Sequence, residues 1–248
     1  GGPLNAKTGM ILSPPNLPGW DRIAICDELT KRFGGRAFLM NDANACALAE
    51  WQFGAGRGCQ SMMFLTMGTG MGAGLILDGR LYEGITGNAG EVGHMRLAGD
   101  GPIGFGKHGS FEGFCSGGGI AQIAKKRVGE YAGESALKAV AVDRLTARVV
   151  GEAAADGDDL ALEIWGEVGE RLGEALAVFI DILNPERIVI GSVFQRCGRF
   201  IAPKINAVIA REALPDSARD CRVVPAELGD EIGGYAAVAI ARYHGQIS

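Results

Sequence analysis

The sequence has no long apolar run and no cluster of basic residues. None of its apolar stretches approaches the roughly 18 to 20 residues that a membrane-spanning helix needs, and its start, GGPLNAKTGM, resembles no signal peptide. The net charge of −5 and the scattered Lys and Arg residues argue against a nucleic-acid binder. We therefore expect a cytoplasmic protein with a small-molecule ligand, no membrane partner and no nucleic acid bound by this chain.

The cysteines form neither a disulfide framework nor a metal motif. There are six, they lie far apart, and no two of them form a C-x-x-C pair. Such an arrangement is typical of reduced, buried thiols in a cytosolic protein.

Glycine, by contrast, is abundant. The chain has 40 glycines among 248 residues, many of them between Gly54 and Gly119. Because glycine weakens helix and strand interiors, it should lie where the backbone needs unusual dihedral angles or approaches a ligand closely. This segment is therefore where we expect the functional site.

Strands and helices alternate along the chain. Four prolines prevent a long helix in residues 1–20, and a helix is predicted from Asp21, a candidate N-cap, to Phe33. Strands that run into helices indicate an α/β architecture rather than a bundle or a sandwich. The other expected elements are strands at 37–40, 61–66, 73–77, 80–82, 187–194 and 221–225, and helices at 45–54, 119–131, 160–183, 202–212 and 234–244.

An Asn-Asp pair, Asn41 and Asp42, follows the apolar run 37–40. If that run is a strand, Asp42 lies where a strand ends and a helix starts, the place where α/β folds gather functional side chains. A carboxylate there can accept the proton of an attacking hydroxyl in phosphoryl transfer. The alternative is that Asp42 only caps the following helix.

A glycine-rich loop separates two apolar runs. In Gly68-Thr69-Gly70-Met71-Gly72, backbone N–H groups can converge on anionic oxygens, and Thr69 adds a hydroxyl donor. The loop lacks the Gly-Lys-Ser/Thr ending of a Walker A motif and lies in a hairpin. It is either a phosphate loop or a tight turn without a ligand.

Three titratable residues lie in other glycine-rich stretches. Glu91 and His94 belong to GNAGEVGHM, and Glu112 belongs to HGSFEGFCSG. Such groups in irregular loops face a ligand more often than the core. His94 could instead bind a metal, but only His108 nearby could add a second ligand.

Taken together, four motifs closely resemble the ROK family (repressor, open reading frame, kinase). They are NDANACALAE, FLTMGTGMGAGLILDGRLYEG, GNAGEVGHM and the GxxGxxE spacing that ends at Glu112. The match covers about residues 1–120 and continues more weakly through IVIGSVF to the last helix. The resemblance implies the actin-like ATPase, ribonuclease-H-like fold, with a cleft between two α/β lobes. We expect residues 1–44 and the helix 235–248 in the smaller lobe, and 45–234 in the larger.

The resemblance also implies an ATP-dependent hexose kinase that uses Mg²⁺. Its substrate would be the 6-OH of a hexose such as glucose, and the family aspartate matching Asp42 is the general base. The positions matching sugar contacts are Asn41, Glu91, His94 and Glu112, and those matching nucleotide contacts are Gly68, Thr69, Gly70, Gly117, Gly118 and Gly191.

Two features differ from the family pattern. The three cysteine positions of the family zinc motif are here Ile103, Phe105 and Ser110, so we expect no zinc and a loop held by packing of Ile103, Phe105 and Phe111. The family's first strand and D-x-G-G-T phosphate loop would precede Gly1, so we expect the smaller lobe to be incomplete in these residues.

Three readings of the function stay open at this point. The chain belongs to a glucokinase-like enzyme, to a kinase for N-acetylmannosamine, N-acetylglucosamine or another hexose, or to the sugar-sensing part of a ROK transcriptional repressor. A sugar-binding scaffold without activity is a further possibility. Because family members commonly form dimers, we expect a homodimer.

Overall fold

The computed structural model describes residues 3–14 and 17–246 of the chain. Its contacts divide the chain into two compact units. The first unit consists of Gly1–Phe64, Ala73–Gly90 and Glu227–Ser248, and the second unit consists of Leu65–Gly72 and Glu91–Ala226. The lobe boundaries expected at residues 44 and 235 stay a prediction.

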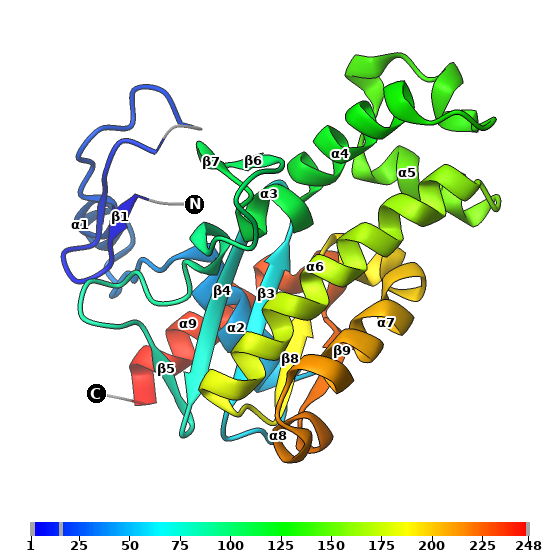
Figure 1. Ribbon diagram of the computed structural model, residues 1–248. Coiled ribbons are helices and arrows are strands. Elements are labelled where there is room, and N and C mark those ends of the chain that lie inside the picture. The colour runs from blue at the N-terminus through cyan, green and yellow to red at the C-terminus, as the bar shows by residue number, and fades with distance from the viewer. Residues whose placement is uncertain (1–2, 15–16, 247–248) are drawn as a thin grey trace. The chain divides into compact units, whose positions relative to one another are not determined.

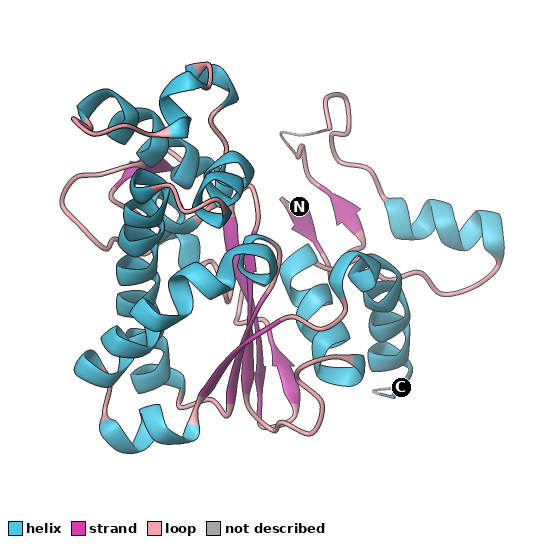
Figure 2. Cartoon of the chain, turned by 90° about the vertical axis from the view of Figure 1, so that its right-hand side faces the viewer, coloured by secondary structure: helices cyan, strands magenta, loops and turns pink. Residues whose placement is uncertain are grey.

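A five-stranded sheet has the strand order β5-β4-β3-β8-β9. Strands are drawn in magenta in Figure 2. Strands β3 (Met62–Met67), β4 (Met71–Leu77) and β5 (Arg80–Tyr82) follow one another along the chain, and β4 and β5 are antiparallel. Strands β8 (Arg187–Ile190) and β9 (Arg222–Pro225) are parallel, which requires a crossover between them. Both β3 and β8 are largely buried and have almost entirely apolar sequences, as expected of interior strands.

In the first unit, helix α2 (Asp42–Phe53) packs against α9 (Ile232–Gln246). The same helix approaches β4 so closely that a side chain at Gly74 would not fit. A Cβ placed there would lie 2.6 Å from the carbonyl oxygen of Ala43. Gly74 therefore sets the distance between the start of α2 and β4. The unit also contains β1 (Leu4–Asn5), β2 (Met10–Ile11), α1 (Ile25–Phe33) and the 3₁₀ turn η4 (Gly229–Glu231).

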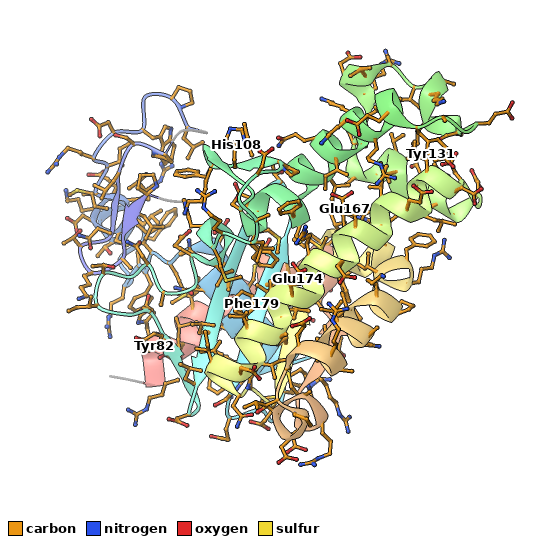
Figure 3. The ribbon with its side chains drawn as sticks, in the orientation of Figure 1. Tyr82, His108, Tyr131, Glu167, Glu174 and Phe179 are labelled. Atoms are coloured by element: carbon orange, nitrogen blue, oxygen red, sulfur yellow. The ribbon has the colours of Figure 1, made fainter. Side chains whose placement is uncertain are left out.

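In the second unit, the long helices α6 (Asp159–Leu183) and α7 (Val193–Glu212) lie side by side (Figure 1). The apolar face of α6 is buried and forms part of the core. Phe179 of α6, labelled in Figure 3, meets the ring of Phe111 with centroids 5.8 Å apart. The unit also contains η1 (Val92–His94), β6 (Ile103–Gly104), β7 (Lys107–His108), α3 (Phe111–Cys115), α4 (Gly117–Glu130), η2 (Ala136–Ala139), η3 (Val142–Arg144), α5 (Ala147–Ala155) and α8 (Pro215–Asp220).

The apolar run 37–40 is not a strand, so this prediction was wrong. A strand exists only through ladder hydrogen bonds to a neighbour, and within residues 3–14 and 17–246 no strand pairs with this run. Its apolar side chains pack in another way. Phe38 stacks on His244 of α9, with ring centroids 4.4 Å apart, and Met40 is buried.

The start of α1 also differs from the prediction. The helix begins at Ile25, four residues after the expected cap Asp21, and Ala24 at the N-cap position makes no side-chain cap. Asp21 instead accepts a hydrogen bond from the hydroxyl of Ser13. A local side-chain partner of this kind competes with the helix for the same carboxylate.

Strand β8 and helix α7 divide the segment 187–212 differently from the prediction. The strand ends at Ile190 and the helix begins at Val193, about nine residues before its expected start. Pro203 lies inside the helix, which continues past it because Ile201 and Ile205 on either side are buried. Tertiary packing therefore outweighs the local tendency of proline to end a helix.

No helix within residues 3–14 and 17–246 combines the length and the apolar composition that crossing a membrane requires.

Candidate active site

The start of helix α4 contacts the glycine loop that follows β3. The N–H of Gly117, the first residue of α4, donates to the carbonyl oxygen of Gly68 at 2.7 Å, and Gly68 N–H donates to Gly70 O at 3.1 Å. A Cβ on Gly117 would lie 3.0 Å from Gly68 O, and one on Gly118 would lie 3.3 Å from Thr69 O. The structure thus brings together two glycine segments for which the family resemblance implies nucleotide contact.

The carboxylate of Glu112 contacts the same loop from its other end. Its Oε2 accepts a hydrogen bond from the N–H of Met71 at 3.0 Å. Glu112 lies in the first turn of the short helix α3, whose N-cap Ser110 accepts from Gly113 N–H. Ser110 thus occupies a zinc-cysteine position of the family pattern and serves here as a helix cap.

Glu91 and His94 lie at the two ends of the 3₁₀ turn η1, and both side chains are exposed. The turn packs against the start of β4 through Gly93, where a Cβ would lie 2.4 Å from the carbonyl oxygen of Met71. The imidazole of His94 meets the edge of the Phe105 ring, with centroids 4.9 Å apart. Glycine at position 93 is therefore what brings this turn beside the loop.

The loop that matches the family zinc motif is held by hydrogen bonds. The side-chain amide of Gln122 in α4 pairs with both backbone groups of Ile103, accepting from its N–H and donating to its carbonyl, each at 2.9 Å. Lys107 Nζ donates to His94 O at 2.7 Å. Arg96 donates to the carbonyl of His108, a residue labelled in Figure 3, at 2.8 Å.

The expectation that apolar packing holds this loop was wrong for two of three residues. Ile103 is 42% exposed and Phe105 is 80% exposed, whereas Phe111 is fully buried. In residues 3–14 and 17–246, no group of three or more His, Cys, Asp or Glu side chains is arranged to hold a metal ion. The absence of zinc from this protein stays a prediction.

A sharp turn joins β8 to α7 beside the glycine loop. Gly191 N–H donates to Leu65 O in β3 at 2.9 Å. Ser192 has φ 58° and ψ −111°, which glycine adopts without strain and other residues rarely do. Its Oγ would lie 3.9 Å from a Cβ on Gly68. Sequence reasoning named Gly191 and missed Ser192, because nothing local marks a serine as strained.

Asn41 and Asp42 belong to the first unit, where they begin α2. Asn41 is the N-cap: its Oδ1 accepts from Ala43 N–H at 2.9 Å and from Asn44 N–H at 3.2 Å. Asp42 is the first residue of the helix and is exposed. Asp42 Oδ1 also accepts from Ala43 N–H, at 3.0 Å, so Asp42 contributes to satisfying the first turn although Asn41 holds the N-cap position. A carboxylate in the first turn of a helix is also favoured by the helix dipole.

Sheet order, helices and glycine turns together define the class of this protein. It is a mixed α/β protein of the actin-like ATPase fold, as expected. Its structure matches the crystal structure of a ROK family glucokinase from Streptomyces griseus in complex with glucose and AMPPNP. The TM-score is 0.78 at 30% sequence identity, and the match covers 95% of this chain and 77% of that one.

The chain belongs to the ROK family, whose family model matches residues 1–244. It is 32% identical over 243 residues to the glucokinase of Thermotoga maritima, covering 97% of this chain and 77% of that enzyme. It is also 32% identical over 227 residues to the DNA-binding transcriptional dual regulator NagC of Escherichia coli. That match covers 89% of this chain and about half, 54%, of the regulator. Sugar kinases and transcriptional regulators are thus both relatives.

Proposed function

We propose that this chain carries the ATP and sugar sites of a ROK hexose kinase. The reaction transfers the γ-phosphoryl group of ATP to a hexose hydroxyl, the 6-OH in a glucokinase. The proposal rests on one observation about the glycine loop of the second unit. Gly117 N–H binds this loop at one end, and the Glu112 carboxylate binds it at the other. This arrangement joins a phosphate-type backbone loop to a carboxylate that suits a sugar hydroxyl. The similarity to two glucokinases supports it.

The nucleotide would lie against backbone rather than against charged side chains. Gly68, Thr69 and Gly70 would face its phosphates, and Gly117, Gly118 and Gly191 would allow close approach. The residues present fit this ligand in one respect: Cβ atoms at Gly117 and Gly118 would crowd the loop carbonyls, so glycine there lets the start of α4 lie against the loop that would hold the phosphates. ATP supplies the phosphoryl group. Mg²⁺ would be held mainly by phosphate oxygens and water, as is usual for this ion.

The sugar would be bound by Glu91, His94, Glu112 and Asn41. A hexose presents neighbouring hydroxyls, each both donor and acceptor, and carboxylate and imidazole groups match that pattern. Glu91 and His94 are exposed in the structure, so their side chains are accessible to a ligand. Glucose is the substrate that we propose first. Recognition of an N-acetyl group depends on pocket shape, so N-acetylmannosamine and N-acetylglucosamine belong in the same test.

Asp42 would accept the proton of the attacking hydroxyl. Asn41 Oδ1 accepts from Ala43 N–H and Asn44 N–H, so these contacts at the start of α2 remain when Asp42 is replaced, although Asp42 Oδ1 also accepts from Ala43 N–H. In phosphoryl transfer the base has a modest role, since positioning and charge stabilisation lower most of the barrier. A positioned base typically contributes about 10²- to 10⁴-fold to the rate.

The second candidate is the sugar-sensing part of a transcriptional repressor. The observation that favours it is the match to NagC, of which this chain covers 54%. The Asn41-Asp42 pair and the Gly68-Thr69-Gly70 loop favour the kinase, because a sensor needs sugar contacts but no general base. The two candidates differ in whether a bound sugar is phosphorylated.

A coupled assay of ADP release with a panel of hexoses tests the proposal. We expect turnover with one or more sugars, and Asp42→Asn should lower kcat by about 10²- to 10⁴-fold while calorimetry shows nearly unchanged sugar binding. Asp143→Asn, at an exposed aspartate in η3, is the matched control and should change neither quantity. Sugar binding without ADP release would favour the sensor. An undiminished rate in Asp42→Asn would remove Asp42 from its role.

A further inference from the structure

The contact between Glu112 and the glycine loop joins two groups with different proposed ligands. Glu112 is a proposed sugar residue, whereas Met71 N–H belongs to the loop that would hold phosphates. Their hydrogen bond, 3.0 Å from Met71 N to Glu112 Oε2, uses one of the two carboxylate oxygens. An ionised carboxylate has acceptor sites on both oxygens and can bind two partners at once.

Three glycines determine where the Glu112 side chain lies. A Cβ on Gly70 would lie 2.7 Å from Oε2, and a Cβ on Gly104 would lie 2.7 Å from the Cβ of Glu112. A Cβ on Gly93 would lie 3.3 Å from that same atom. The stem of Glu112 is thus packed against backbone on two sides, and its carboxylate occupies the space that a residue larger than glycine would take at position 70.

The same element also holds the other end of the loop. Ser116 N–H donates to Glu112 O at 3.0 Å and links the end of α3 to the start of α4, where Gly117 N–H donates to Gly68 O. The side chain of Ser116 caps α4 by accepting from Gly119 N–H at 3.0 Å. Residues 111–130 therefore contact the loop at Gly68 and at Met71, and movement of Glu112 changes the second contact directly.

We propose that Glu112 is a positioning residue that couples sugar binding to nucleotide binding. Oε2 keeps the Met71 N–H and the loop in the conformation that receives phosphates, while the carboxylate also accepts a sugar hydroxyl. A bound sugar restricts the carboxylate, and the restricted carboxylate restricts the loop. This inference rests on the proposed function and adds that each ligand strengthens the binding of the other, as linkage requires.

Two measurements test this coupling. The first is amide hydrogen exchange at Met71, which needs no ligand. Glu112→Ala should speed exchange at Met71 by at least about 10-fold, whereas Glu112→Gln should restore most of the protection, because an amide oxygen can still accept the bond. Glu91→Ala is the matched control: it removes another proposed sugar contact without touching the loop, so Met71 exchange should stay at the wild-type rate.

The second measurement is the affinity for AMPPNP by calorimetry, with and without a saturating hexose. The hexose is the best substrate in the panel, or glucose if none is phosphorylated. We expect the sugar to tighten AMPPNP binding by about 5- to 20-fold in the wild type, within the usual range of allosteric coupling. This factor should fall to about 1 in Glu112→Ala. Gly70→Ala, which keeps Glu112 but would displace its carboxylate, should behave in the same way.

The outcomes separate this inference from the proposed function. Unchanged Met71 exchange in both Glu112→Ala and Gly70→Ala would overturn the positioning role, even if the enzyme phosphorylates a sugar. An AMPPNP affinity that is independent of sugar in the wild type would overturn the coupling. Absence of ADP release with every hexose would contradict the kinase proposal alone, because Met71 exchange and AMPPNP affinity are read without turnover.

Discussion

Replacing Glu50, a fully buried carboxylate in α2, should strongly destabilise the first unit. The side chain has 0% of its surface exposed. Its oxygens accept from three backbone N–H groups: Ala55 at 2.7 Å, Leu228 at 3.0 Å and Glu227 at 3.1 Å. Glu50 therefore connects the end of α2 to the segment that leads into α9. A Cβ on Gly54 would lie 2.1 Å from its Oε2, which explains the glycine there.

The expected magnitude follows from these three bonds. A hydrogen bond to a charged group contributes about 1.5–3 kcal/mol, and contributions at one carboxylate are not additive. We expect Glu50→Ala to lower the free energy of unfolding by about 3–5 kcal/mol, the range seen when one partner of a buried charged contact is removed. Glu50→Gln keeps one acceptor oxygen but replaces the other with an NH₂ group, which would face a backbone N–H donor. This change should lower the free energy of unfolding by about 1.5–3 kcal/mol.

Urea denaturation followed by circular dichroism and tryptophan fluorescence measures these differences. The matched control is Glu28→Ala in α1 of the same unit, whose side chain is 66% exposed and pairs with Lys31 at 3.5 Å. It should cost no more than about 0.5 kcal/mol, as exposed ion pairs usually do. If Glu50→Ala shifts the unfolding midpoint no further than Glu28→Ala does, the three backbone bonds do not stabilise the unit and the reasoning is refuted.

Two further changes test the second unit. Ser192→Gly should raise the melting temperature, because it relieves a strained backbone conformation that costs about 1 kcal/mol. The change keeps the backbone N–H that donates to Gln195 Oε1. A lower melting temperature would show that this conformation is not strained. For Asp158, burial raises the pKa, but hydrogen bonds from Ala161 N–H, Ala136 N–H and the Ser135 hydroxyl lower it below its ordinary value overall. Its stabilising effect should be complete above the unfolded-state pKa of about 4 and disappear as pH falls through the lower folded-state pKa. Asp158→Ala should thus cost about 1–2 kcal/mol at pH 7 and less at pH 3, which lies below the unfolded-state pKa, and an equal cost at both would be the contrary result.

The sequence predicted the end of a helix correctly where the residues that mark the end lie in the last turn of that helix. The end of α6 at Asn184 was expected from Asn-Pro, and Asn184 adopts the left-handed conformation, with φ 43°, that Asn tolerates. The end of α2 before Gly54 was also expected, but its cause is a contact rather than a dihedral angle. Gly54 has φ −117° and leaves room for the carboxylate of Glu50.

Local signals failed where an element depends on a distant neighbour. The run 37–40 has the composition of a strand, yet strand identity needs a second strand at hydrogen-bonding distance. A helix was expected at 202–212, whereas α7 begins about nine residues earlier, at Val193, and continues through Pro203. In both cases the secondary structure depended on which distant residues pack against the segment. The local sequence of the segment does not contain that information.

The motif order by itself determined the family, the α/β class and the identity of the candidate residues, because glycine, carboxylate and imidazole groups at those spacings are local properties of the chain. Only the tertiary structure decided which residues touch: Glu112 accepts from Met71 N–H, Gly117 N–H donates to Gly68 O, and the side-chain amide of Gln122 pairs with the backbone of Ile103. These contacts join residues 19 to 49 positions apart. Hydrogen bonds at such separations form only when the packed core brings their partners within about 3 Å, so their existence could not be inferred from composition or spacing.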